Sequence, residues 1–95
     1  MPKRTADSHA LPEDGKEMIT FRLGGDGSMS ESRKDGRHWE YGSERAVWPT
    51  CIQGVADHMA KSRAQEGWQD AMPWFWIVRV TDLKQALPNE FQLPH

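Results

Sequence analysis

The chain has 95 residues, of which 27% are charged, and its formal net charge is −2. This length fits one domain with a modest core and leaves little room for a deep substrate cavity. The mixed charge excludes a nucleic-acid binder that works through an overall basic field, and it is too weak for a mimic of DNA.

The cysteine content and the hydropathy of the chain indicate the cellular compartment to expect. Cys51 is the single cysteine, so no intramolecular disulfide and no zinc site built from thiolates alone can form. A lone thiol is more typical of a reducing compartment than of a secreted protein. No apolar stretch follows the basic first four residues, and the longest apolar run, residues 72–78, is far too short to span a bilayer. We therefore expect a cytoplasmic protein that does not enter a membrane.

The first 16 residues are polar, contain two prolines and a glycine, and show no periodicity. This composition predicts a flexible N-terminal arm over residues 1–16. The remaining residues, 17–95, are expected to form a single domain.

Two strands are expected at the start of that domain. Residues 17–23 alternate apolar and polar side chains, and this period of two predicts a half-buried strand. The run Gly24-Gly25-Asp26-Gly27 ends it in a turn. Residues 28–32 are polar apart from Met29, and we expect them to return as an edge strand.

A third short strand follows a second turn. Residues 33–36 end in Asp-Gly, which is a turn signal. Residues 38–41 then place Trp39 and Tyr41 on one face, and such aromatic residues suit a pleated surface.

The middle of the chain predicts one amphipathic helix over residues 49–66. Apolar residues recur with helical spacing at Ile52, Val55, Ala56, Met59 and Ala60. Pro49 suits the first turn, Thr50 with Gln53 can form a capping box, and Gly67 suits the C-terminal cap.

Residues 74–80 form the strongest strand pattern. Both of its faces are apolar, which is typical of a strand at the centre of a sheet. A short helix over residues 83–87 should follow, and Phe91 is then available to pack back on the body.

This order, β-β-β-α-β and then a short C-terminal helix, indicates a small α+β domain. One antiparallel or mixed sheet with the main helix packed on one face is the natural two-layer arrangement.

The sequence contains no motif for a cofactor or a metal ion. The glycine-rich residues 24–28 match neither dinucleotide nor phosphate-loop spacing. Cys51 lies near the helix start, where the helix dipole lowers the pKa of a thiol. His58 lies two helical turns away, about 11 Å, which is too far for a dyad within that helix. We expect no cofactor and no enzymatic activity, with a small enzyme that uses Cys51 as one alternative.

Basic and aromatic side chains alternate in residues 33–41. Arg33, Lys34 and Arg37 lie beside Trp39 and Tyr41, a combination that resembles surfaces on which single-stranded bases stack. A nucleic-acid-binding module is therefore the other alternative.

The five tryptophans are the most unusual feature of the composition. Trp74 and Trp76 are expected in or near the core, and Trp48 at the helix start. Trp68 follows the cap glycine in a polar stretch, and exposed tryptophan is enriched where proteins bind one another.

The sequence thus favours a small non-enzymatic intracellular interaction protein that binds a larger protein or complex through an aromatic-rich surface. An inhibitor or adaptor would fit, including an inhibitor of a host defence system carried by a phage or mobile element. The expected partner-contacting residues are Trp68, Trp39, Tyr41, Arg33, Lys34 and Arg37. A homodimer remains open, because an edge strand can pair with its own copy.

Overall fold

The computed structural model describes residues 10–67 and 73–91. Its strands are β1 (Met18–Leu23), β2 (Met29–Arg33), β3 (His38–Gly42) and β4 (Trp74–Arg79). Its α-helices are α1 (Thr50–Gln65) and α2 (Val80–Ala86), and a short 3₁₀ helix spans Arg45–Val47.

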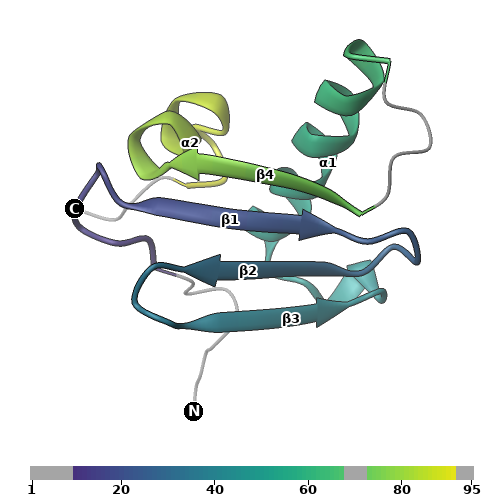
Figure 1. Cartoon of the computed structure of the whole chain (residues 1–95), viewed down its shortest axis with the longest axis horizontal. Coiled ribbons are helices and arrows are strands. Elements are labelled where there is room, and N and C mark those ends of the chain that lie inside the picture. The colour runs from purple at the N-terminus through teal and green to yellow at the C-terminus, as the bar shows by residue number, and fades with distance from the viewer. Residues whose placement is uncertain (1–9, 68–72, 92–95) are drawn as a thin grey trace.

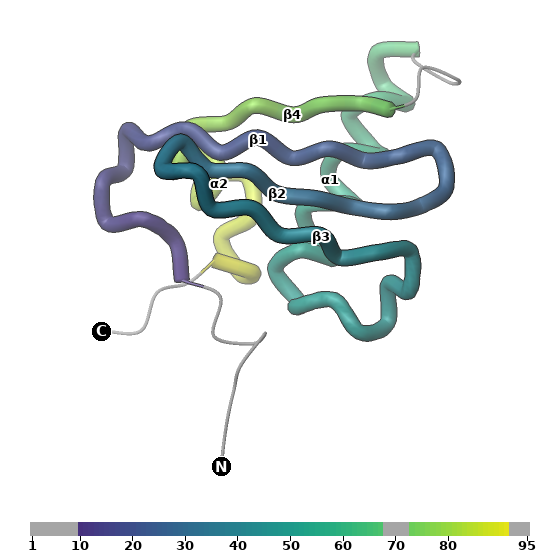
Figure 2. The backbone as a smooth tube through the Cα atoms, turned by 60° about the horizontal axis from the view of Figure 1, so that its bottom comes forward, coloured from purple at the N-terminus to yellow at the C-terminus, as the bar shows by residue number. Residues whose placement is uncertain are grey.

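The four strands form one antiparallel sheet in the order β3-β2-β1-β4. Both α-helices lie behind the sheet in Figure 1, and the turned view of Figure 2 places them on the same side. The result is a two-layer α+β domain, which confirms the predicted fold class and element order. The opposite face of the sheet, here called the outer face, is covered by no described helix.

The positions of two strands differ from the predictions. β4 was expected at the centre but lies at an edge, because it pairs only with β1. β2 was expected at an edge but lies between β1 and β3. The second apolar face of β4 is thus left open to solvent, while the charged side chains of β2 are buried and pair with each other.

The core lies between the inner face of the sheet and the two helices. Its largest fully buried apolar side chains are Phe21, Ile19, Met29, Ile52, Met59 and Leu83. Burial of each such side chain contributes about 1.5–3 kcal/mol. Four of the five predicted stripe positions of α1 are buried, whereas Ala60 is exposed. Phe91 is also buried, as expected.

The ends of α1 are set by backbone more than by side-chain caps. The helix begins at Thr50, after Pro49 in the capping position, and no side-chain capping bond forms. The predicted capping box is therefore wrong. The side-chain amide of Gln53 donates instead, through Nε2, to the Trp48 carbonyl at 3.1 Å. Gly67 has a φ of 79°, which confirms its predicted role beyond the helix end.

The second helix begins earlier than expected. It starts at Val80, directly after β4, and not at residue 83. The Val80 N–H still donates to the Glu17 carbonyl at 2.9 Å, so the strand ladder continues into the first helical residue.

The chain before β1 touches the body at several points. Leu11 is buried in the core, and the Thr81 N–H donates to the Gly15 carbonyl at 3.0 Å. The start of the predicted arm, residues 1–9, lies outside the described residues.

A buried ion pair lies on the inner face of β2. Arg33 Nε donates to Glu31 Oε2 at 2.8 Å, and their side chains are 1% and 0% exposed. The Tyr41 hydroxyl donates to the other Glu31 oxygen at 3.1 Å. Arg33 Nη2 donates to the Ala10 carbonyl at 2.9 Å. These bonds satisfy the two charges in a region where water is excluded.

We expect Arg33→Met to lower the free energy of unfolding by about 3–5 kcal/mol, because it removes the guanidinium that pairs with the buried Glu31 carboxylate. The double variant Glu31→Gln with Arg33→Met should lose less, since it removes both charges and keeps an acceptor for Tyr41. Urea unfolding of the three proteins measures the difference. A single variant as stable as the double variant would contradict a structural role for the pair.

Candidate interaction surface

The turn between β2 and β3 gathers part of the predicted contact set. Lys34 and Arg37 are exposed there, and Trp39 is half-buried. The guanidinium carbons of Arg33 and Arg37 lie 4.7 and 5.7 Å from the centre of the Trp39 ring. Cation–π contacts of this kind are worth about 0.5–2 kcal/mol. They hold Trp39 against the edge of the sheet.

Arg33 and Tyr41 are less exposed than Lys34 and Arg37. The Arg33 side chain is 1% exposed, pairs with Glu31 and contacts the Trp39 ring. Tyr41 is half-buried, and desolvation together with the Glu31 carboxylate raises its pKa well above the ordinary value. Trp68, the remaining predicted contact residue, lies outside the described residues.

The geometry of residues 33–41 weakens the stacking surface that nucleic acid would need. Guanidinium groups lie over the Trp39 ring. The exposed Arg37 donates through Nε to Asp35 Oδ2 at 2.8 Å. Chiefly the hydrogen bond from the Arg37 backbone N–H lowers the pKa of the Asp35 carboxyl below its ordinary value, so the ionised Asp35 offsets part of the positive charge. Nucleic-acid binding stays a prediction.

Three further tryptophans stabilise the core, as expected. Trp48 is buried, and its Nε1 donates to the Tyr41 carbonyl at 2.7 Å. Trp74 and Trp76 are partly buried and pack against the core. The Trp76 ring centre lies 4.8 Å from that of His58 on α1. These rings fasten the helix layer to the sheet and leave little indole surface for a partner.

Cys51 has the environment of a packing residue. It is buried at the start of α1, and desolvation, followed by the nearby Glu31 carboxylate, raises the pKa of its thiol to about 11. A nucleophilic cysteine needs the opposite shift. Among residues 10–67 and 73–91, no three His, Cys, Asp or Glu side chains are placed to hold a metal ion.

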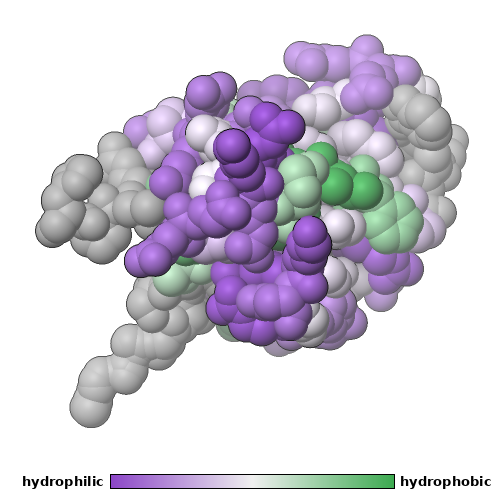
Figure 3. All heavy atoms as spheres, turned by 60° about the vertical axis from the view of Figure 1, so that its left-hand side comes forward, coloured by the Kyte–Doolittle hydropathy of each residue, from purple (hydrophilic) through white to green (hydrophobic). Residues whose placement is uncertain are grey.

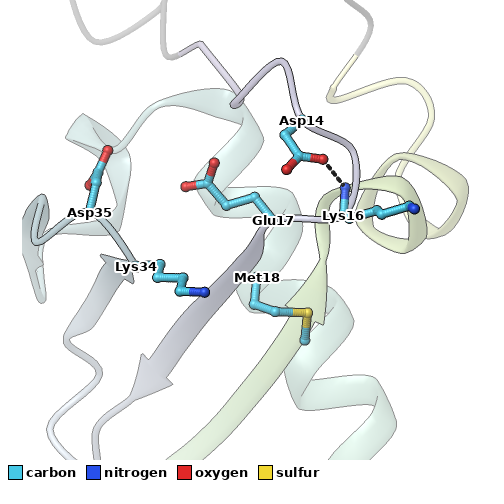
Figure 4. A pocket seen from close by; sticks show the side chains of 6 residues that line it. All are labelled: Asp14, Lys16, Glu17, Met18, Lys34 and Asp35. Atoms are coloured by element: carbon cyan, nitrogen blue, oxygen red, sulfur yellow. Dashed lines mark hydrogen bonds between the residues drawn. The ribbon is translucent and has the colours of Figure 1, made fainter.

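An open depression of about 330 Å³ lies where β1 begins, beside the β2–β3 turn. Its lining residues are Asp14, Lys16, Glu17, Met18, Lys34 and Asp35. Three acidic and two basic residues line it, and their charged ends do not converge on one point (Figure 4). Asp14 accepts a bond from the Lys16 backbone N–H at 2.9 Å, which is a turn contact. The depression therefore lacks the convergent groups of a binding site for a small molecule.

The outer face of β1 and β4 carries exposed apolar side chains that were not predicted from the sequence. Met18, Phe75 and Ile77 are 40%, 53% and 63% exposed. Thr20 pairs with Ile77 in the sheet, so Met18 lies diagonal to Ile77 on the same face. Figure 3 shows an apolar area bordered by hydrophilic side chains. We call these three residues the apolar strip.

A signal for the apolar strip was present in the sequence. Phe75 and Ile77 alternate with Trp74, Trp76 and Val78, so both faces of that strand are apolar. The pattern predicted a central strand, and the edge position of β4 turns the same pattern into exposed surface.

A scan of the chain against protein-family models, and searches of curated proteins and of solved structures, find no match. None of the helices in the described part of the chain is long and apolar enough to cross a membrane.

We expect Cys51 to react slowly with a disulfide reagent at pH 8. A thiol with an ordinary pKa is about one quarter ionised at that pH, whereas a pKa near 11 leaves about one thousandth as thiolate. The absorbance of released thiolate reports the rate, with the urea-unfolded chain as reference. We expect the folded protein to react at least about 100-fold more slowly. Equal rates would show that the thiol is accessible and easily ionised.

Proposed function

We propose that this chain is a small non-enzymatic interaction protein that binds a larger protein or complex through the apolar strip. The observation that carries the proposal is the exposure of Met18, Phe75 and Ile77 together on one sheet face. Contiguous exposed apolar side chains rimmed by polar ones are typical of interaction sites. Full burial of Phe75 and Ile77 against a partner would contribute about 1.5–3 kcal/mol each.

The proposed class of function is the one predicted from the sequence, but the proposed binding site lies on a different part of the sheet. The sequence predicted the contact at Trp68, which lies outside the described residues, and around Trp39, Tyr41 and the turn at residues 33–37. Arg33 is buried and Trp39 is held by two guanidinium groups, so that region offers less free apolar surface than β4 does. A cytoplasmic location and an inhibitor or adaptor role belong to the same proposal. The burial of Cys51 and its raised thiol pKa argue against this residue as a nucleophile.

We expect the double variant Phe75→Thr with Ile77→Thr to lose its partner while it keeps its fold. Threonine retains strand propensity, and central apolar side chains of an interface typically contribute more than 1 kcal/mol each. Recovery of the partner should fall about tenfold or more. The measurement is quantitative mass spectrometry of proteins captured by the tagged chain from a lysate of its source organism or of that organism's host.

Val47→Thr is the matched control, because Val47 is 70% exposed and lies away from the strip. It should capture the partner as the parent chain does. Each capture is repeated with nuclease. A partner retained by the double variant would contradict the location of the site, and a partner lost only with nuclease would favour the nucleic-acid alternative.

A further inference from the structure

The outer edge of β4 exposes a regular row of backbone hydrogen-bonding groups. The Val80 N–H donates to the Glu17 carbonyl at 2.9 Å, in register with the β1–β4 pairing. Along an antiparallel ladder, residue pairs that exchange backbone hydrogen bonds alternate with pairs that do not. Every second residue of β4 therefore directs its N–H and C=O away from β1, and these residues are Phe75, Ile77 and Arg79. In the part of the chain that the structure describes, no strand lies beyond β4.

The helix layer continues where the sheet stops. In both Figure 1 and Figure 2 the C-terminal half of α1 extends past β4. The buried residues of α1 end at Met59, although the helix runs to Gln65. A strand added beside β4 would therefore have helix behind it as well as backbone groups alongside it.

The two edges of the sheet are unlike. On the outer face, β3 presents His38 and Glu40, which contact each other at 2.8 Å. Charged residues of this kind discourage pairing at a sheet edge. β4 presents Phe75 and Ile77 instead, so its edge favours the addition of a strand.

The charges around the apolar strip favour an added strand that carries an acidic residue. By alternation with the buried residues of β1 and β4, the outer face of these strands carries Arg22 and Arg79 and no acidic residue. Arg22 pairs with Phe75 in the register, and Arg79 ends β4. A carboxylate on the incoming strand opposite Arg79 would complement this charge.

A second copy of the chain fits less well. The antiparallel register that uses all three edge residues would place Arg79 of each copy opposite Phe75 of the other. Each Phe75 already has Arg22 as its neighbour on the other side. Such a dimer would gather four cations on the outer faces of its β1 and β4 strands, which carry no acidic residue there, and like charges in that arrangement repel.

We propose that β4 binds an extended segment of a partner protein as a fifth, antiparallel strand, with the pattern acidic-x-apolar-x-apolar. The acidic residue lies opposite Arg79, and the two apolar residues lie opposite Ile77 and Phe75. Antiparallel pairing matches the rest of the sheet. Backbone bonds provide affinity and the alternate side chains provide specificity, as in other cases of strand addition. This inference rests on the proposed function and specifies its mode.

The test is an amide NMR titration of the full chain with the capped peptide Thr-Glu-Thr-Val-Thr-Ile-Thr. We expect saturable shifts of the Phe75, Ile77 and Arg79 backbone amides. A peptide with Lys in place of Glu should bind about two- to fivefold more weakly, the range of an exposed ion pair. Arg79→Glu should reverse that preference.

Two substitutions at one position separate strand addition from docking on the face. Ile77→Thr and Ile77→Pro both remove the isoleucine side chain, but only proline also removes the backbone N–H that points away from β1. An edge strand tolerates proline at such a position. The proline variant should bind about three- to tenfold more weakly than the threonine variant. Glu40→Pro makes the same change at the β3 edge and should bind as the parent does.

The possible results are distinct. Equal binding by the proline and threonine variants, or no shifts with millimolar peptide, would overturn strand addition and leave the capture experiment to decide the proposed function. A dimer in the free protein that Ile77→Pro dissolves would make the second copy the occupant and overturn the peptide assignment. If Ile77→Pro does not fold, the amide shifts of the parent chain still decide, because strand addition should shift the outward amides of Phe75, Ile77 and Arg79 more than those of Trp76 and Val78.

Discussion

The buried ion pair of Glu31 and Arg33 is the constraint on which much of this structure depends. A carboxylate and a guanidinium without water must satisfy each other and their remaining bonds from nearby groups. They do so with the Tyr41 hydroxyl on β3 and the Ala10 carbonyl before β1. The pair therefore ties two separate segments, β3 and the chain before β1, to β2. Desolvation first, and then the negative charge of Glu31, raise the pKa of both the Cys51 thiol and the Tyr41 hydroxyl.

The ion pair also divides the sheet into two unlike halves. On the β3 side, charged and aromatic groups hold one another, and the guanidinium groups of both Arg33 and Arg37 contact the Trp39 ring. On the β4 side, the inner face is filled by Val78 and half-buried tryptophans, and the outer face is apolar and open. Polar groups that already have partners offer little to a ligand, so the half with free apolar surface is the better candidate for binding.

A two-layer domain has a sheet face that its own helices cannot cover. In most of this sheet that face is polar, with Ser30, Ser32 and Glu40 among its residues. The exception is the region of β1 and β4, where an apolar strip and an open strand edge coincide. Side chains that gain from burial and backbone groups that gain from pairing are thus available to the same partner.

The sequence alone determined the types and approximate limits of the elements, because the periods of apolar residues, the turn glycines and Gly67 act locally. It also determined that Phe75 and Ile77 are apolar. Only the tertiary structure decided what they face. Strand order depends on pairing between distant segments, here β1 with β4, and local patterns do not contain it. For the same reason Arg33 resembled a surface cation: its burial depends on Glu31 and Ala10, which reach it only when the sheet has formed.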